Sequence, residues 1–275
     1  MNTQRTAAGE LVGKVIRYLA DHPDQADLQS VARALEVSPK LLVAVPVIRQ
    51  LLQPAGLEGF LDWTLRDWLH YHYLFLHQGY RYGEPELQPT WRGRVLLKNP
   101  LDCWIYQEIL HRTKPDVLLE LGVAYGGSAQ FFADIMELSG HGEVLGVDIS
   151  LERAHGFNHP RVTLIEGSSI APETVAHVHE RCRGKRVMVF ADSNHAADHV
   201  LAELQAYAGL VGMDMYYIVE DTLADVLDLM PVPIDGPLAA VNSFLANHPE
   251  FERDSRIAER YILSQSPYGF LRRVR

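Results

Sequence analysis

The chain has 275 residues and a formal net charge of −10 at pH 7, with 47% hydrophobic and 22% charged residues. This composition is typical of a globular protein, and the length suffices for one α/β domain of about 150–200 residues plus an accessory segment. The net charge is −2 up to Thr90 and −8 from Trp91 onward, so neither part offers the basic surface that nucleic-acid binding requires. The two cysteines, Cys103 and Cys182, exclude a disulfide framework and a cysteine-based zinc site.

The sequence shows no secretory signal peptide and no apolar run long enough to cross a membrane. We therefore expect a cytoplasmic protein whose partner is a small-molecule acceptor rather than a nucleic acid or a membrane. A homo-oligomer is also expected, because the extra apolar helical segment at the start of the chain must bury one face.

The first part of the chain predicts short helices over residues 9–22, 27–35 and 38–52, with Asp27 and Ser38 as caps of the second and third. Their rhythm is compatible with a helix-turn-helix. However, the segment is not basic, and its recognition helix would be mostly apolar. A helical cap or oligomerisation segment is therefore the favoured interpretation.

Residues 54–91 are dense in aromatic side chains. Trp63, Trp68, Tyr71 and Phe75 fall at helical spacing, which favours a packed helix face over a binding box. The turn-rich stretch 79–93 is either a lid that faces a substrate or an ordinary connection. The pattern does not separate these two readings.

From residue 98 the pattern becomes regular. Helices are predicted over 100–112, after the glycine turn at 122–128, and over 172–183 and 196–210; strands are predicted over 117–122, 143–149, 161–167, 185–193 and 215–222. Strands that alternate with helices imply a parallel sheet with right-handed crossovers. Residues 260–265 and 268–274, joined by a turn, predict an antiparallel C-terminal hairpin at the sheet edge. The expected fold class is α/β, a Rossmann-like sheet over 91–275, with a helical segment over 1–90.

The central motif is a buried strand, a glycine turn and a helix over 117–139. Its glycines, Gly122, Gly126 and Gly127, are followed by Ser128 in the pattern G-x-x-x-G-G, which differs from the dinucleotide pattern G-x-G-x-x-G. Glycines let the backbone pass close to a ligand, and free N–H groups at the start of the helix can meet its polar parts. The motif predicts a nucleotide-type cofactor other than NAD.

Each of the five predicted parallel strands ends in an acidic residue. In open α/β sheets, ligands bind outside the carboxyl ends of the strands. The acids are Glu120, Asp148, Glu166, Asp192, and the pair Glu220 and Asp221. Asp148, at the end of the second strand, is placed to bind both ribose hydroxyls of a nucleoside, or else to cap a helix. Gly167, Ser168 and Ser169 could meet an adenine edge.

Asp192, Glu220 and Asp221 predict a magnesium site. Converging carboxylates would repel one another without a cation, and a hard divalent ion with oxygen ligands removes that repulsion. Such an ion can lower the pKa of a substrate hydroxyl. His195, three residues after Asp192, could take the proton or could simply start a helix. An acidic ribose site without a phosphate-binding lysine motif favours S-adenosylmethionine as the cofactor.

With these residues in view, the chain from about Trp91 to Val274 resembles the cephalosporin hydroxylase and rhamnosyl O-methyltransferase family. These are class I S-adenosylmethionine-dependent enzymes of natural-product and antibiotic biosynthesis. The motifs that carry the resemblance are WRG (91–93), KNPLDCWIYQEIL (98–110), ELGVAYGGSAQFFAD (120–134), GVDI (146–149), EGSS (166–169), DSNHAADHVLAEL (192–204), YIVEDT (217–222) and PYGFLRRV (267–274).

The resemblance implies a cofactor site and a magnesium site. The implied cofactor contacts are Glu120, Gly122, Tyr125, Gly126, Gly127, Ser128, Asp148, Ile149, Gly167, Ser168 and Asp192. The implied metal ligands are Asp192, Glu220 and Asp221, with His195 or Asp192 as the catalytic base. One departure is Asn194, where the family more often has an aspartate.

The leading hypothesis is a magnesium-dependent O-methyltransferase that acts on a hydroxyl of a sugar or another secondary metabolite. The same fold and cofactor could instead support N- or C-methylation or cyclisation of the cofactor. A hydroxylase ranks lower, because a redox iron site favours two histidines beside one carboxylate. A regulator that senses the cofactor is disfavoured by the charge.

Overall fold

The computed structural model describes residues 89–227, 235–261 and 264–275, together with 11, 14–22, 28–37, 42 and 69. The chain divides into two compact units, Met1–Gln88 and Pro89–Arg275. In the first unit, residues 14–21 and α2 (Leu28–Ala34) are helical, as predicted, and a small core contains Leu11, Val15, Val31, Ala32 and Leu42.

Most of the third predicted helix, the aromatic segment, and the candidate lid before residue 89 lie outside the described residues. The role of residues 1–90 as a cap or oligomerisation segment therefore stays a prediction.

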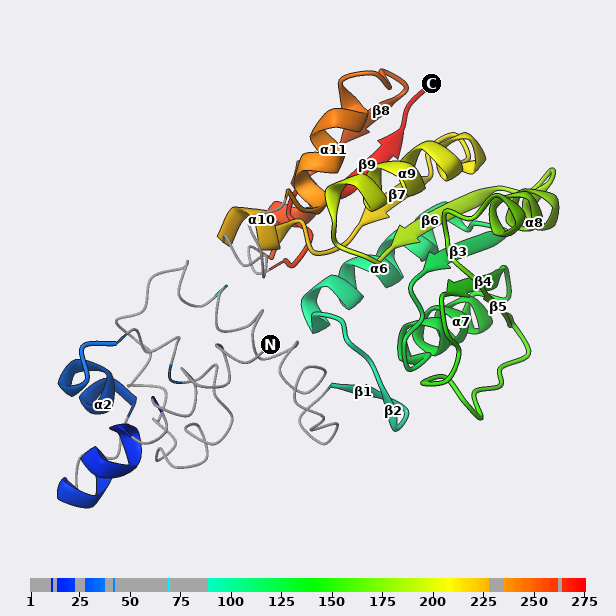
Figure 1. Ribbon diagram of the computed structural model, residues 1–275. Coiled ribbons are helices and arrows are strands. Elements are labelled where there is room, and N and C mark those ends of the chain that lie inside the picture. Colours follow the sequence, from blue (N-terminus) through cyan, green and yellow to red (C-terminus); the bar gives the residue numbers. More distant parts are fainter. Residues whose placement is uncertain are drawn as a thin grey trace. The chain divides into compact units, whose positions relative to one another are not determined.

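A seven-stranded mixed sheet forms the second unit, in the order β5-β4-β3-β6-β7-β9-β8 (Figure 1). The five strands predicted to be parallel are parallel, and β9 pairs antiparallel with both β7 and β8. The strands are β3 (Val117–Leu121), β4 (Glu143–Asp148), β5 (Val162–Glu166), β6 (Val187–Ala191), β7 (Tyr216–Val219), β8 (Phe251–Arg253) and β9 (Phe270–Arg273). This is a Rossmann-like sheet with an antiparallel edge, as the sequence predicts.

Helices cover both faces of the sheet because the strand residues alternate between two apolar clusters. Leu119, Val189 and Tyr217 pack toward α8 (Pro172–Cys182), α9 (Ala197–Tyr207) and α11 (Pro237–Leu245). Leu118, Phe190 and Ile218 pack toward α6 (Pro100–Thr113) and α7 (Gly127–Leu138). Shorter elements are η4 (Ala208–Leu210), α10 (Leu223–Leu227) and α12 (Ser255–Glu259). Within the described part of the chain, no helix is both long and apolar enough to span a bilayer.

A short β-hairpin precedes the sheet. Strands β1 (Thr90–Trp91) and β2 (Arg94–Val95) pair antiparallel around a turn in which Arg92 and Gly93 have positive φ. The Trp91 indole N–H donates to Asp134 Oδ2 at 2.7 Å, and its ring meets Phe131 edge-on, so the hairpin is fixed to α7. The described end of the predicted lid therefore packs on a helix.

The predicted antiparallel C-terminal hairpin is present, but its strand pairing differs from the prediction. Residues 268–274 do contain β9, which pairs with β7 and with β8 (Phe251–Arg253). The segment 255–259 is helical and a turn follows at 260–261; Ser264 and Gln265 are buried outside any strand. The Gln265 N–H donates to Asp102 Oδ2 on α6 at 2.8 Å, so a long-range bond competes with strand pairing here.

Packing against neighbouring segments requires glycine at two positions of this turn, whether or not a ligand binds. Gly122 has φ +92°, and a Cβ at this position would lie 2.1 Å from the carbonyl oxygen of Asp192. A Cβ at Gly127 would lie 1.9 Å from the carbonyl oxygen of Val95. The turn therefore lies directly against the end of β6 on one side and β2 on the other.

We predict that Gly122→Ala lowers the free energy of unfolding by about 2–5 kcal/mol, because it adds a backbone clash to the cost of a left-handed φ. Gly140→Ala is the matched control, since Gly140 also has positive φ (+65°) but has nothing within 4 Å of the added Cβ. The control should cost only about 1–2 kcal/mol. Urea unfolding of both variants tests this, and equal losses would contradict the clash.

Candidate active site

The carboxyl ends of β3, β4, β6 and β7 meet at one edge of the sheet, since these strands are parallel neighbours. They bring together Glu120, Asp148, Asp192 and the pair Glu220 and Asp221, as the sequence predicts. Glu120 is 0% exposed and Glu220 and Asp221 are each 3% exposed, so these acids are buried and do not form an ordinary solvated surface.

A buried lysine that the sequence analysis did not single out lies among these acids. Lys98 is 2% exposed, and its Nζ donates to Asp192 Oδ2 at 2.5 Å and lies 3.4 Å from Glu220 Oε2. The Tyr106 hydroxyl, from α6, donates to Glu220 Oε1 at 2.5 Å. The chain thus supplies its own cation for two of the three carboxylates that were expected to need a metal. The available signal was the position of Lys98 directly before the Asn99 cap of α6.

Two opposing effects set the pKa values in this cluster: burial, which favours the neutral form of each group, and attraction between opposite charges, which favours the charged form. Burial alone would lower the pKa of Lys98, but Asp192, Glu220 and Glu120 raise it above its ordinary value, so the ammonium stays charged. Burial raises the pKa of Glu220 to about 8 and that of Glu120 to about 7, while Lys98 opposes both shifts. The ammonium of Lys98 therefore opposes the effect of burial on both carboxyl groups without cancelling it.

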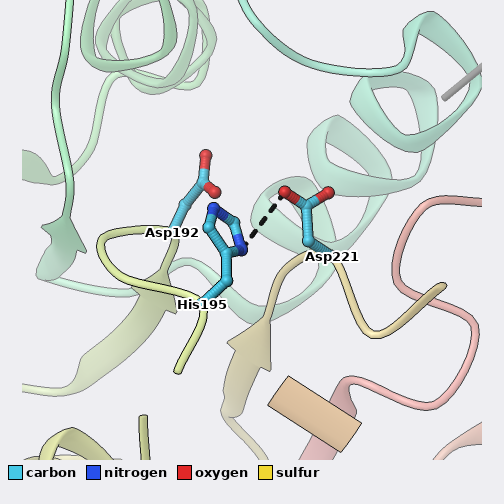
Figure 2. A group of neighbouring side chains, drawn as sticks. All are labelled: Asp192, His195 and Asp221. Atoms are coloured by element: carbon cyan, nitrogen blue, oxygen red, sulfur yellow. Dashed lines mark ion pairs between the residues drawn. The ribbon is translucent and has the colours of Figure 1, made fainter. Parts of the chain in front are cut away.

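Asp192, His195 and Asp221 form a second group at the same edge (Figure 2). One ligand atom from each lies within 4.8 Å of the others, a spacing that could hold a metal ion. His195 Nδ1 lies 3.4 Å from Asp221 Oδ2. Asp221 has φ +57°, a strained conformation for a non-glycine residue and a common sign of a functional position. The predicted ligand Glu220 lies beside this group, with its oxygens facing Tyr106 and Lys98.

Asp148, at the end of β4, holds the glycine turn through backbone hydrogen bonds. Its Oδ2 accepts the backbone N–H groups of Val123 and Ala124, both at 2.8 Å, and its Oδ1 accepts from Ser150 N at 3.1 Å. The carboxylate therefore fixes the turn in addition to the predicted ribose role. Oδ1 keeps acceptor capacity, since a carboxylate oxygen can accept more than one bond.

Glu120 is the clearest unfilled acceptor at this edge. Neither of its carboxylate oxygens makes a hydrogen bond within the described residues, although the Ser128 hydroxyl is near enough to lower the pKa of the carboxyl. A buried carboxylate without donors is costly, so it marks a place where a ligand donor would be stabilised.

The remaining predicted cofactor residues lie around this turn. Gly126 precedes the first residue of α7, Gly127, and Ser128 is 8% exposed in its first turn. Ile149 is 71% exposed beyond the end of β4. The other three lie in adjacent loops: Tyr125, whose carbonyl accepts from Arg94, Gly167, whose N–H donates to the Asp148 carbonyl, and Ser168.

Asn194, the departure from the family pattern, has a local role. Its Oδ1 accepts from the backbone N–H of Ala196 at 2.9 Å, where α9 begins. An aspartate could accept the same bond, so this exchange leaves the start of the helix intact.

We predict that Lys98→Met lowers the free energy of unfolding by about 3–5 kcal/mol at neutral pH in the absence of metal, because it leaves buried carboxylates without their cation. Lys185→Met is the control, since the Lys185–Glu143 pair is half-exposed and such pairs contribute about 1 kcal/mol or less. Chemical denaturation in chelator measures both. A loss no larger than the control's would show that Lys98 does not hold the site together.

Three comparisons place this architecture. Residues 86–274 match the family model described as Rhamnosyl O-methyltransferase/CmcI. The rhamnosyl O-methyltransferase of Mycobacterium tuberculosis is 32% identical over 189 residues, which cover 66% of this chain and 77% of that protein. The Mycobacterium leprae protein of the same name is 33% identical over 188 residues, covering 66% and 82%.

Solved structures agree with the sequence relatives. A structure of CmcI with Mg and SAM has a TM-score of 0.54 at 25% identity, over 68% of this chain and 77% of that one. An apo structure of CmcI has the same TM-score at 26% identity, over 68% and 76%.

The fold and the acidic edge define a methyltransferase of the Rossmann-like class. The chain belongs to the Rhamnosyl O-methyltransferase/CmcI family, as the resemblance in its motifs implied.

Proposed function

We propose that the protein is an S-adenosylmethionine- and Mg²⁺-dependent O-methyltransferase that acts on a hydroxyl of a sugar or another secondary metabolite. The observation that carries this proposal is the juxtaposition, at one sheet edge, of a glycine turn beside an unpartnered buried carboxylate and a cluster of oxygen ligands. The names of the mycobacterial relatives support a sugar hydroxyl as the acceptor, and the CmcI structure with Mg and SAM supports both cofactors.

The residues at the glycine turn fit S-adenosylmethionine. The unpartnered oxygens of Glu120 suit the ammonium of its methionine part, and Asp148 Oδ1 suits a ribose hydroxyl. Gly126, Gly127 and Ser128 place the N-terminal N–H groups of α7 at the same turn. Tyr125, Ile149, Gly167 and Ser168 would line the remainder of the nucleoside.

The donor set at the end of β6 and β7 fits Mg²⁺. Asp192 and Asp221 offer carboxylate oxygens within 4.8 Å of each other, and Mg²⁺ prefers oxygen to imidazole. Glu220 would complete the predicted set with lone pairs that Tyr106 and Lys98 leave available. Lys98 donates to Oδ2 of Asp192, so Oδ1 would remain available to a metal.

The chemistry assigned to the site is a single methyl transfer. S-adenosylmethionine, when bound, supplies an activated methyl group on a sulfonium, and Mg²⁺ would lower the pKa of the acceptor hydroxyl. Asp221 Oδ2 lies 3.4 Å from Nδ1 of His195, so Nε2 is the ring nitrogen that would take the hydroxyl proton. S-adenosylmethionine would supply the methyl group to the acceptor oxygen and leave as S-adenosylhomocysteine, and the other product would be a methyl ether.

Asp192→Ala and Asp221→Ala are expected to lower turnover by more than about 10²-fold, because the metal loses a carboxylate ligand. Both variants should still bind S-adenosylhomocysteine, whose predicted contacts lie mainly at β3 and β4. Asp198→Ala, an exposed carboxylate in the first turn of α9, is the control.

Isothermal titration with S-adenosylhomocysteine, with and without Mg²⁺, measures binding, and mass spectrometry on candidate acceptors measures transfer. A mass gain of one methyl on a sugar hydroxyl supports the proposal. Cofactor consumption without that gain would favour cyclisation, and full turnover in chelator would reject the metal role.

His195→Gln should reduce kcat by about 10²–10⁴-fold, the usual contribution of a general base, with S-adenosylhomocysteine affinity unchanged. His177→Gln, exposed on α8, serves as the control. Wild-type kcat in His195→Gln would instead assign the proton to another acceptor such as Asp192.

A further inference from the structure

One face of α9 carries three polar side chains that the proposed chemistry does not use. His199, Glu203 and Tyr207 are spaced four residues apart, so they lie along the same side of the helix. Glu203 and Tyr207 are 0% exposed, and His199 is 20% exposed at its side chain. A buried polar row on a helix that begins just after Asp192 and His195 calls for an explanation beyond solvation.

Glu203 joins two loops through one oxygen atom. Its Oε1 accepts from the Ser169 hydroxyl at 2.5 Å and from the Ser193 hydroxyl at 2.5 Å. Tyr207 adds a second hydrogen bond between α9 and Ser169, since its hydroxyl donates to the backbone carbonyl of Ser169 at 2.5 Å. Hydrogen bonds to a charged, buried acceptor are among the stronger ones in proteins.

The two serines come from opposite sides of the proposed site. Ser169 follows Ser168, a predicted cofactor contact after β5, and Ser193 follows Asp192, a predicted metal ligand after β6. In the sheet, β4 and β3 lie between β5 and β6, a separation of about 14 Å at normal strand spacing. The Glu203 side chain therefore bridges two loops that follow strands far apart in the sheet.

The constellation of Ser169, His199 and Glu203 is not a catalytic triad. In such a triad the two ring nitrogens contact different partners. Here the same His199 Nε2 faces both the Ser169 hydroxyl (3.1 Å) and Glu203 Oε1 (3.3 Å), and Ser169 is buried. The bond to Glu203 raises the pKa of His199, so the imidazole serves as a further partner for the buried carboxylate.

We infer that Glu203 is a positioning residue that holds the cofactor loop (167–170) and the metal loop (192–195) in register through Ser169 and Ser193. Glu203 is not among the residues proposed to contact either ligand, and each serine belongs to the loop that it would hold. This inference rests on the proposed function, because it assigns the two loops to S-adenosylmethionine and Mg²⁺.

The test removes the Ser169–Glu203 bond and the Ser193–Glu203 bond one at a time, in the full-length protein. Ser169→Ala should weaken S-adenosylhomocysteine binding about tenfold and leave Mg²⁺ affinity within about twofold, because a charge-assisted hydrogen bond is lost on one side only. Ser193→Ala should do the reverse. Glu203→Ala should weaken both ligands. Isothermal titration of each ligand alone, with thermal melting of each variant, measures these effects; Ser243→Ala, exposed on α11, is the control.

Crossed effects of the two serine variants support the inference, whether or not Glu203→Ala folds. Equal weakening of both ligands by each serine variant, or no weakening by either, overturns it and leaves Glu203 with a purely structural role. If the wild-type protein binds neither S-adenosylhomocysteine nor Mg²⁺, the proposed function itself fails, and that result is distinct from any pattern among the variants.

Discussion

The site depends on one buried ion pair, between the ammonium of Lys98 and the carboxylate of Asp192, with Glu220 as the second acceptor. Parallel strands bring their carboxyl ends together, and here several of those ends are acidic. Without an internal cation the folded chain would place uncompensated charges in a low-dielectric interior, which is strongly unfavourable. Lys98 offsets part of the repulsion among the acids at this edge.

The same packing links the two halves of the edge. Gly122 lies against the carbonyl of Asp192, so the glycine turn and the metal loop are in direct backbone contact. Asp148 fixes that turn from the other side through two backbone N–H groups. Glu203, on α9, accepts hydrogen bonds from Ser169 and Ser193 and so connects the loops after β5 and β6. The proposed methyl transfer requires a donor carbon and an acceptor oxygen in line, and such rigid ties would favour that orientation.

Family membership and site geometry answer different questions about this protein. The match over residues 86–274 establishes the family, whereas the names of the relatives suggest an acceptor class without fixing it. Asp192, His195 and Asp221 lie in one group, while Glu220 faces inward to Tyr106 and Lys98. Asp192 links the two groups, because it also accepts from Lys98.

Local periodicity and topology in the sequence suffice to predict the five parallel strands, the helices between them, the glycine turn and the acids at the strand ends. The pairing of β9 with β8 depends on long-range packing, as does the position of Gln265, whose N–H donates to Asp102 on α6. The tertiary structure also decided the roles of Lys98, which is 94 residues from Asp192, and of Glu203, which is 34 from Ser169. A lysine before a helix or a glutamate within one looks solvated in sequence, and only packing shows which of them are buried against charge.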